Sequence, residues 1–205
     1  MSIPRLHIII DNYSLAEKAI NGGAKLIQYR KKNFSYKNDI EELKKIREIT
    51  KQNDVILIIN DFPGLAMEIN ADGVHVGIED TPLQTLKENF PHNKIIGFSV
   101  HNLEELAIAN KFPEIISYIG VGSVFPSPTK KVKLLSSGKF EQICKQSKFP
   151  VIAIGGITTE KICYLLQKGA YGVAVISAFT KTPDPINTVV NMLTTINNCV
   201  PAISP

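Results

Sequence analysis

The stretch IEELKKIREITKQNDVILII, residues 40–59, holds one unit of a pattern that the chain repeats. Apolar side chains recur every three residues over 40–49, with charged residues between them, which predicts an amphipathic helix. Residues 55–59 are then apolar at every position, as is typical of a strand that is covered on both faces. A helix that leads into a doubly covered strand is half of a parallel βαβ unit.

The same pattern extends outward along the chain in both directions. Short apolar runs, separated by polar turns and segments of helical periodicity, occur at residues 6–10, 25–29, 55–59, 73–76, 95–98, 118–121, 151–154 and 172–176. Eight strand–helix units in 205 residues match the lower size range of one architecture. The sequence therefore predicts a single (β/α)8 TIM barrel.

An open, doubly wound sheet is the alternative fold. Such a sheet normally has a Gly-x-Gly-x-x-Gly turn after its first strand, whereas residues 11–14 here read DNYS. No linker divides the chain, so we expect one domain over residues 1–205, with a frayed tail at 198–205. Residues 126–138 lack periodicity after the sixth strand and are a lid candidate.

Composition and charge restrict the class of protein. Hydrophobic residues make up 44% and charged residues 20%, as in an ordinary globular protein, and the formal net charge is +4. That small excess does not favour nucleic-acid binding, but it suits anionic substrates. We find no signal-peptide pattern and no apolar run near the roughly 20 residues that span a bilayer, so we expect a cytoplasmic protein with no membrane contact.

The three cysteines are Cys144, Cys163 and Cys199. They show no metal-ligand spacing and no Cys-x-x-Cys motif. We therefore expect reduced, mostly structural thiols.

Polar residues that follow the strands define a candidate site, because the carboxyl ends of all strands in such a barrel open into one bowl. Arg30, Lys32 and Lys130 follow different strands and should converge as a clamp for a diphosphate. Asp61 and Asp80 end the adjacent third and fourth strands. Since Mg²⁺ takes one or two carboxylates together with phosphate oxygens and water, this pair predicts a Mg²⁺ site.

A second anion site is predicted on the other side of the bowl. Gly155 and Gly156 follow the seventh strand, and Ile176 and Ser177 follow the eighth. Glycines let backbone N–H groups approach a phosphate, and barrels often bind one after these two strands. The bowl can thus hold a metal-bound diphosphate at one side and a monophosphate at the other.

Several of these residues also have plainer interpretations. The basic residues after the second strand could be solvated, and the two aspartates could cap the helices that follow them. His7 and His75 lie within strands and are expected to be packed rather than catalytic, and His101 is expected to cap the next helix. No nucleophile–base pair stands out in the sequence, which favours chemistry driven by leaving-group stabilisation over covalent catalysis.

An ordered set of motifs runs from about residue 5 to residue 180. It comprises IQYRKK at 27–32, IND at 59–61, ADGVHVGIED at 71–80, IGFSVH at 96–101, GVGSVFPSPTK at 120–130, IAIGGI at 152–157 and VISA at 175–178. Each motif is weak alone, but the set in this order resembles the thiamine-phosphate synthase family. The resemblance implies the coupling of 4-amino-2-methyl-5-hydroxymethylpyrimidine diphosphate with a thiazole phosphate, which gives thiamine phosphate and diphosphate.

The resemblance also implies a role for each matching residue. Gln28 would contact the pyrimidine, and Asp61 and Asp80 would hold Mg²⁺. The diphosphate would be bound by Arg30, Lys32, Asn60, Ser99 and Lys130, and all of these except Asn60 would act directly in catalysis. The thiazole phosphate would be bound by Ser127, Thr129, Gly156, Ile176 and Ser177.

The chain departs from the family pattern in three places. Ile78 stands where a Gln is usual, Val132 and Lys133 stand where an acidic residue is common, and Ile10 stands where a Thr is usual.

The closest rival function is that of the related thiazole tautomerases, isomerases on the same barrel, which have a His where this chain has Ser123. A non-catalytic sensor that binds thiamine phosphate or its precursors is a further alternative. The sequence leaves open whether the chain forms a homo-oligomer.

Overall fold

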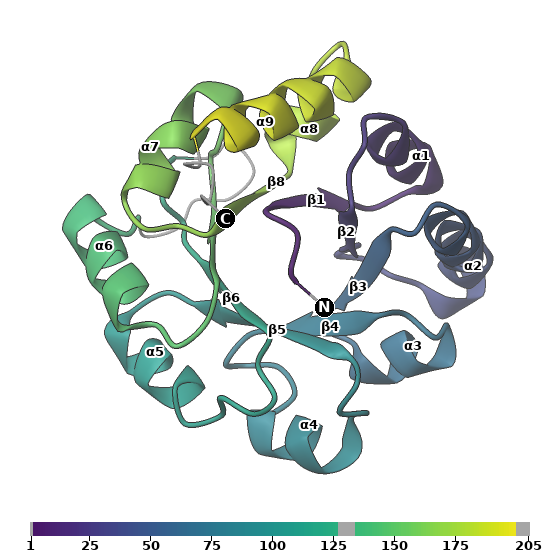
Figure 1. Cartoon of the computed structure of the whole chain (residues 1–205). Coiled ribbons are helices and arrows are strands. Elements are labelled where there is room, and N and C mark those ends of the chain that lie inside the picture. Colours follow the sequence, from purple (N-terminus) through teal and green to yellow (C-terminus); the bar gives the residue numbers. More distant parts are fainter. Residues whose placement is uncertain (1, 127–133, 200–205) are drawn as a thin grey trace.

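The strands of this chain close into a ring, and the helices surround it (Figure 1). The computed structural model describes residues 2–126 and 134–199. In this part of the chain, eight parallel strands pair in sequence order, and β1 pairs with β8 at Leu6 and Val173. The prediction of a single (β/α)8 barrel is confirmed, and the closed ring excludes the open-sheet alternative.

The strands are β1 (Leu6–Ile10), β2 (Leu26–Tyr29), β3 (Ile56–Asn60), β4 (Gly73–Val76), β5 (Ile95–Val100), β6 (Tyr118–Val121), β7 (Val151–Ile154) and β8 (Gly172–Val175). The helices are α1 (Tyr13–Asn21), α2 (Tyr36–Gln52), α3 (Pro63–Glu68), α4 (Leu83–Asn89), α5 (Leu103–Ala109), α6 (Ser137–Gln146), the 3₁₀ helix η1 (Thr159–Lys161), α7 (Ile162–Gln167), α8 (Ser177–Thr180) and α9 (Pro185–Cys199). The predicted strands differ from these bounds by at most two residues at either end.

The core has two layers, because successive side chains of a strand point to opposite faces. The larger layer fills the space between the barrel and the helices and contains, for example, Ile8, Leu57 and Ile119. A smaller apolar cluster lies inside the barrel around Tyr118 and Ile152. The buried polar side chains His7, Gln28, Asn60 and His75 also belong to inward-facing positions of the strands.

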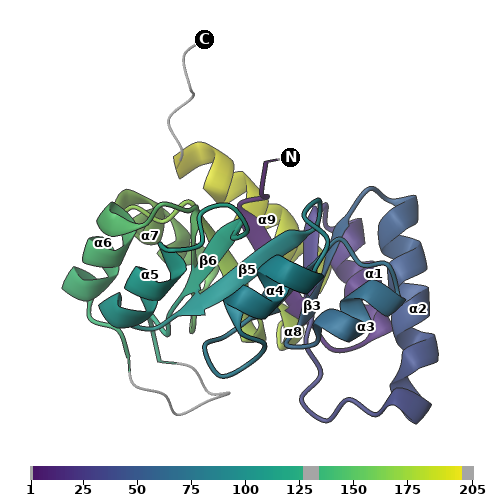
Figure 2. The ribbon, with the colours of Figure 1, turned by 90° about the horizontal axis from the view of Figure 1, so that it is seen from below.

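The amino-terminal end of the barrel is closed by contacts of its own. Arg5 donates to the carbonyl oxygen of Tyr171 at 2.8 Å, and its guanidinium carbon lies 4.4 Å from the centre of the Tyr171 ring. The Tyr171 hydroxyl donates to the carbonyl oxygen of Ile3 at 2.9 Å. Seen from the side, the amino terminus lies at the end of the barrel opposite α8 (Figure 2).

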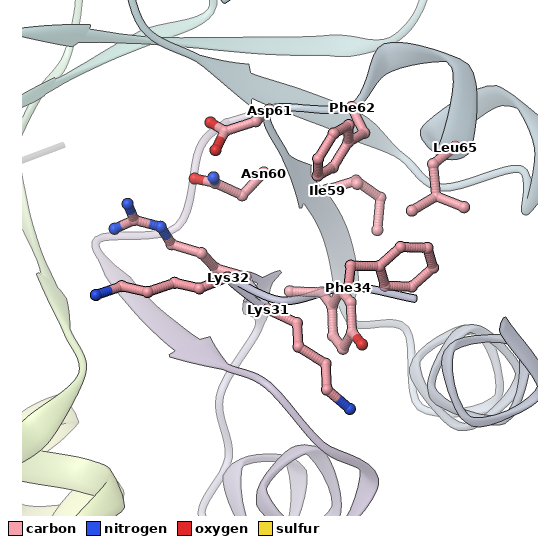
Figure 3. A pocket seen from close by; sticks show the side chains of 10 residues that line it. Lys31, Lys32, Phe34, Ile59, Asn60, Asp61, Phe62 and Leu65 are labelled. Carbon is pink, nitrogen blue, oxygen red and sulfur yellow. The ribbon is translucent and has the colours of Figure 1, made fainter. Parts of the chain in front are cut away.

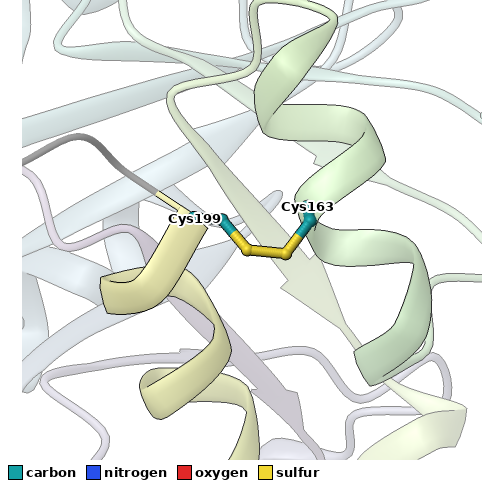
Figure 4. The surroundings of a disulfide bond; sticks show 2 residues. All are labelled: Cys163 and Cys199. Carbon is teal, nitrogen blue, oxygen red and sulfur yellow. A yellow bond between two sulfur atoms is a disulfide. The ribbon is translucent and has the colours of Figure 1, made fainter.

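A disulfide joins Cys163 in α7 to Cys199 at the end of α9 (Figure 4). The expectation of reduced thiols is therefore wrong for this pair, whereas Cys144 is a free cysteine. The two residues are 36 positions apart, but α7 packs against α9 and brings their Cα atoms to 5.4 Å, within the usual range for a disulfide. Only this packing relates the two cysteines, and the sequence does not display it.

Two predicted boundaries need correction. Helix α9 continues through Cys199, so the expected fraying does not begin at residue 198, and the rest of the tail, 200–205, lies outside the described residues. Helix α6 begins at Ser137, inside the predicted lid segment, because the Ser136 side chain caps it. Residues 127–133 of that segment are also outside the described part. No helix in the described residues is long and apolar enough to cross a membrane.

Candidate active site

The carboxyl ends of the strands surround a cavity of about 500 Å³, here called the bowl. The predicted site residues that line it are Gln28, Arg30, Asn60, Asp61, Asp80, Ser99, Gly156, Ile176 and Ser177. They come from every strand end except those of β1 and β6, so closure of the barrel brings together residues that are up to about 150 positions apart. Ser127, Thr129 and Lys130 lie outside the described residues.

A buried amide pair forms the wall between β2 and β3. The Gln28 side chain donates from Nε2 to Oδ1 of Asn60 at 2.7 Å, and both residues are less than a tenth exposed. Buried amides are normally hydrogen-bonded in this way, and the bond fixes their orientation. The two side chains therefore present fixed polar groups to the bowl.

Asp61 and Asp80 lie at the same side of the bowl, next to Arg30. The backbone of Asp61 is in the left-handed region, with φ of 66°, and its N–H donates to the carbonyl oxygen of His75 at 2.8 Å. Burial, and then the negative charge of Asp80, raise the pKa of Asp61 to about 6, while Arg30 acts in the opposite direction. Two carboxylates placed this close together favour a proton or a cation between them.

This pair fits a magnesium ion in the number and type of its ligands. In the described residues, no cluster of three or more His, Cys, Asp or Glu side chains could hold a metal. A metal at Asp61 and Asp80 would therefore have two protein carboxylates and would take its other ligands from substrate and water. Mg²⁺ is commonly bound in this way, whereas structural zinc takes four protein ligands.

The capping alternatives are not supported. The N-cap residues of α3 and α4 are Phe62 and Pro82, so neither aspartate caps the helix that follows it. Asn102, rather than His101, caps α5, and it accepts a hydrogen bond from the backbone N–H of Glu105 at 2.8 Å. The ring of His101 instead lies 2.9 Å from the Glu105 carboxylate at the edge of the bowl. The capping prediction for His101 is wrong because the cap falls one residue later.

The opposite side of the bowl is formed by a glycine turn after β7. Gly155 and Gly156 have positive φ angles of 106° and 59°, and a Cβ atom on Gly156 would collide with the carbonyl oxygen of Pro126. The backbone N–H of Phe125 donates to Gly155, and the Lys161 ammonium donates to the carbonyl oxygen of Gly156 at 2.7 Å. The same ammonium lies 4.5 Å from the centre of the Phe125 ring. These contacts fix the turn in a shape that only glycine adopts readily.

The sequence predicts Lys32 in the bowl, but the structure places it in a smaller side pocket of about 170 Å³. This pocket lies between the loops after β2 and β3, and Phe34 and Phe62 form its apolar wall (Figure 3). Lys31 and Lys32 extend in opposite directions there, and Lys31 pairs with Asp39 of α2 at 2.8 Å. Lys32 stands three residues beyond the end of β2, and its pocket shares Arg30, Asn60 and Asp61 with the bowl, so Lys32 lies beside the proposed diphosphate side.

Two further side chains of the bowl, His75 and Tyr118, have no function assigned from the sequence. His75 is buried, as predicted, and its ring also lines the bowl, where Nε2 lies 2.9 Å from Oγ of Ser99. Its Nδ1 lies 3.1 Å from the hydroxyl of Tyr118. Glycines inside β5 and β6, Gly97 and Gly120, leave the space that these rings occupy. A glycine within a strand is the signal that could have pointed to this close approach.

The fold and the bowl define a class of protein, a (β/α)8 barrel with a polar, partly charged cavity at the carboxyl ends of its strands. The family model described as "Thiamine monophosphate synthase" matches residues 6–179, which is most of the chain. The chain therefore belongs to the thiamine monophosphate synthase family.

Individual relatives agree with this assignment. The chain is 47% identical over 166 residues to a thiamine-phosphate synthase from Hydrogenobaculum sp., a match that covers 79% of this chain and 75% of the relative. It is 41% identical over 172 residues to a thiamine-phosphate synthase from Persephonella marina, covering 83% and 81%. A solved structure of thiamine phosphate pyrophosphorylase from Pyrococcus furiosus matches with a TM-score of 0.86 and 33% identity over 96% of each chain.

Proposed function

We propose that this chain is a thiamine-phosphate synthase that joins 4-amino-2-methyl-5-hydroxymethylpyrimidine diphosphate to a thiazole phosphate. The products are thiamine phosphate and diphosphate. One observation carries the proposal: a single bowl has paired carboxylates beside Arg30 at one side and the Gly155-Gly156 turn at the other. Two anionic substrates can therefore meet in it, one with a metal-bound diphosphate and one with a monophosphate.

The proposed diphosphate site is built from side chains. Arg30, Asn60 and Ser99 line the bowl and can donate hydrogen bonds to diphosphate oxygens, and Lys32 and Lys130 are proposed to add charge from the adjoining loops. Gln28, held by Asn60, is proposed to bind the pyrimidine. Asp61 and Asp80 would hold Mg²⁺, which when bound neutralises charge on the diphosphate.

The chemistry that these residues support is loss of the diphosphate followed by capture of the pyrimidine. The carbon–oxygen bond to the diphosphate breaks and its electron pair leaves with the diphosphate. The thiazole nitrogen then donates its lone pair to the resulting pyrimidine-stabilised carbocation, which forms the new carbon–nitrogen bond. Arg30, Lys32, Ser99 and Lys130 would favour the first step by binding the charge that develops on the leaving oxygens.

The proposed thiazole-phosphate site is built mainly from backbone. Gly156, Ile176 and Ser177 line this side of the bowl, and Ser127 and Thr129 are proposed to complete it. The glycine turn lets backbone N–H groups approach a phosphate closely. This arrangement would place the thiazole on the side of the bowl that faces the pyrimidine.

The tautomerase alternative is not favoured. The position at which tautomerases have a His is Ser123 here, and its hydroxyl donates to the carbonyl oxygen of Phe125 at 3.2 Å. Ser123 therefore supports the loop after β6 rather than acting as an acid or base. The family assignment and the relatives also favour the synthase. A cytoplasmic location and a homo-oligomeric state stay predictions.

A coupling assay tests the proposed function. Purified protein is mixed with Mg²⁺, pyrimidine diphosphate and thiazole phosphate, and thiamine phosphate and diphosphate are measured. We expect equal release of both products and loss of turnover with EDTA. Binding of both substrates by folded protein without any product would instead support the sensor.

A further inference from the structure

A chain of hydrogen bonds runs from the interior of the barrel to the bowl. The Tyr118 hydroxyl lies 3.1 Å from Nδ1 of His75, and Nε2 of the same ring lies 2.9 Å from Oγ of Ser99. A Cβ atom on Gly97 would collide with both rings, so this strand position leaves room for them. The Tyr118 ring also packs against the His7 ring in a T-shaped arrangement, with centroids 4.8 Å apart.

The protonation states of the two rings are set by their burial. The His75 ring is buried, and its two nitrogens face the hydroxyls of Tyr118 and Ser99 rather than a carboxylate, so neither hydrogen-bond partner favours a charged ring. The imidazole is therefore neutral at physiological pH. Burial also raises the pKa of the Tyr118 phenol far above its ordinary value, so its hydroxyl keeps its proton.

A neutral imidazole has one nitrogen that donates and one that accepts. Among the described residues, His75 is the hydrogen-bond partner found for the Tyr118 hydroxyl. A buried hydroxyl that donates to Nδ1 satisfies both groups and leaves the imidazole proton on Nε2. That nitrogen then donates to Ser99, whose oxygen acts as acceptor.

The consequence concerns the hydrogen of Ser99. If His75 donates to Oγ, the Ser99 hydroxyl hydrogen is not used within the chain of bonds and can point into the bowl. In the other tautomer Ser99 would donate to His75 and would turn oxygen lone pairs toward an anionic ligand. The tautomer of His75 thus decides whether Ser99 attracts or repels a diphosphate oxygen.

We infer that His75, held in one tautomer by Tyr118, is a positioning residue that directs the Ser99 hydroxyl hydrogen toward the leaving diphosphate. This inference rests on the proposed function for the identity of the ligand. In this inference His75 and Tyr118 influence the diphosphate only through Ser99.

The test is a double-mutant cycle with the full chain. Tyr118→Phe removes the hydroxyl and keeps the ring, so the tautomer is no longer fixed. We expect kcat to fall about 5- to 10-fold, the loss of one oriented hydrogen bond, with the KM for thiazole phosphate unchanged. In a Ser99→Ala background, which is itself slower, Tyr118→Phe should lower kcat no further.

A matched control is Tyr171→Phe, which removes a hydroxyl at the other end of the barrel, where it bonds to Ile3. This variant should keep the kcat of the unmodified chain. Equal losses from Tyr118→Phe in both backgrounds would show a structural effect and would overturn the inference.

A spectroscopic measurement separates this inference from the proposed function. ¹⁵N-histidine NMR of the unmodified chain should show the His75 proton on Nε2, and Tyr118→Phe should shift or broaden that signal. A proton on Nδ1 in the unmodified chain refutes the inference whatever the activity. Absence of coupling activity in a chain with the Nε2 proton would refute the proposed function and with it the catalytic role of Ser99.

Discussion

On the β2–β4 side of the bowl most of the groups that line the cavity are charged or amide side chains, whereas on the β7–β8 side they are apolar side chains, the glycine turn and Ser177. Asp61 and Asp80 represent the first side, and the turn at Gly155 and Gly156 the second. A side-chain site depends on charge and protonation, which conservative substitutions change without altering the fold. A backbone site depends on geometry, and any added Cβ alters it. Conservative substitutions on the side-chain side should therefore lower activity without altering the fold, whereas an added Cβ on the backbone side should distort the site itself.

The largest effect should come from removing one charge on the side-chain side. Asp61→Asn is expected to lower Mg²⁺-dependent turnover by about 1,000-fold, because it removes a carboxylate from the proposed metal site. The fold should persist, since Asn tolerates the left-handed backbone that Asp61 adopts. Steady-state kinetics with varied Mg²⁺ and circular dichroism measure the two quantities.

Asp54→Asn is the matched control for this variant. Asp54 also has a positive φ, of 53°, but it is exposed in the turn before β3, away from the bowl. Its substitution should leave turnover unchanged. Full activity of Asp61→Asn would remove Asp61 from the metal site.

Reduction of the Cys163–Cys199 disulfide should weaken the structure that supports the backbone side. Cross-linking residues 36 positions apart is expected to stabilise the chain by about 2 to 4 kcal/mol through the entropy of the unfolded state. Urea unfolding with and without a thiol reductant measures this difference. A variant with both cysteines replaced by serine should unfold identically in the two conditions, and an unchanged midpoint in the parent chain would contradict the expectation.

On the backbone side, Gly156→Ala should raise the KM for thiazole phosphate by about 10- to 100-fold. The expected strain of about 1–3 kcal/mol comes from a positive φ and from the collision of the new Cβ with Pro126. Kinetics with each substrate varied in turn would show whether the effect is confined to one side. Gly64→Ala is the control, because nothing lies within 4 Å of a Cβ at Gly64. Equal changes in the KM values for the pyrimidine diphosphate and for thiazole phosphate would contradict the proposed difference between the two sides of the bowl.

The smallest effect should come from His7, which is buried in the barrel interior, and it concerns the pH dependence of the free energy of unfolding. Burial lowers the pKa of His7 from 6.5 to about 4, so the folded chain binds fewer protons than the unfolded chain between these values. The stabilisation is complete above pH 6.5 and is lost as the pH falls toward 4. At pH 5, His7 alone should reduce the free energy of unfolding by about 2 kcal/mol relative to pH 8.

His7→Asn isolates this contribution. An Asn can still donate to the Pro4 carbonyl oxygen that lies 3.0 Å from the His7 ring, but it does not titrate. The loss of stability between pH 8 and pH 5 should therefore be smaller in the variant, while other titrating groups cancel in the difference. Urea unfolding at both pH values measures it, and equal losses in the two proteins would indicate that water reaches His7.

The sequence predicted the barrel because its strands are continuous apolar runs, a pattern that depends only on local residues. It also predicted which strand ends hold the side-chain site, since Asp61 and Asp80 directly follow β3 and β4. Contacts between residues that are far apart in the chain could not be predicted from such local patterns. The Cys163–Cys199 pairing depends on how α7 and α9 pack, and the contact between His75 and Tyr118 depends on the space that glycines leave across three strands.

The position of Lys32 could not be predicted from the sequence for a different reason. Its charge type and its position after β2 suggested the bowl, but the direction of a side chain in a loop is set by backbone angles that the residue itself does not encode. The same reason explains why the cap of α5 was assigned to His101 rather than to Asn102. Strand ends can be located from sequence to within one or two residues, and a one-residue difference changes which side chain faces the site.

The pairing of β1 with β8 has a consequence for synthesis of the chain. The ribosome synthesises the amino terminus first, so the edge of β1 that pairs with β8 has no partner strand until residues near 173 have been made. The carboxylates are encoded in the first 80 residues, whereas the glycine turn and Ser177 arrive more than 70 residues later. Contacts between such distant segments form slowly, and an unpaired strand edge can associate with other chains in the meantime. Nascent chains that stall before β8 are therefore expected to depend on chaperones.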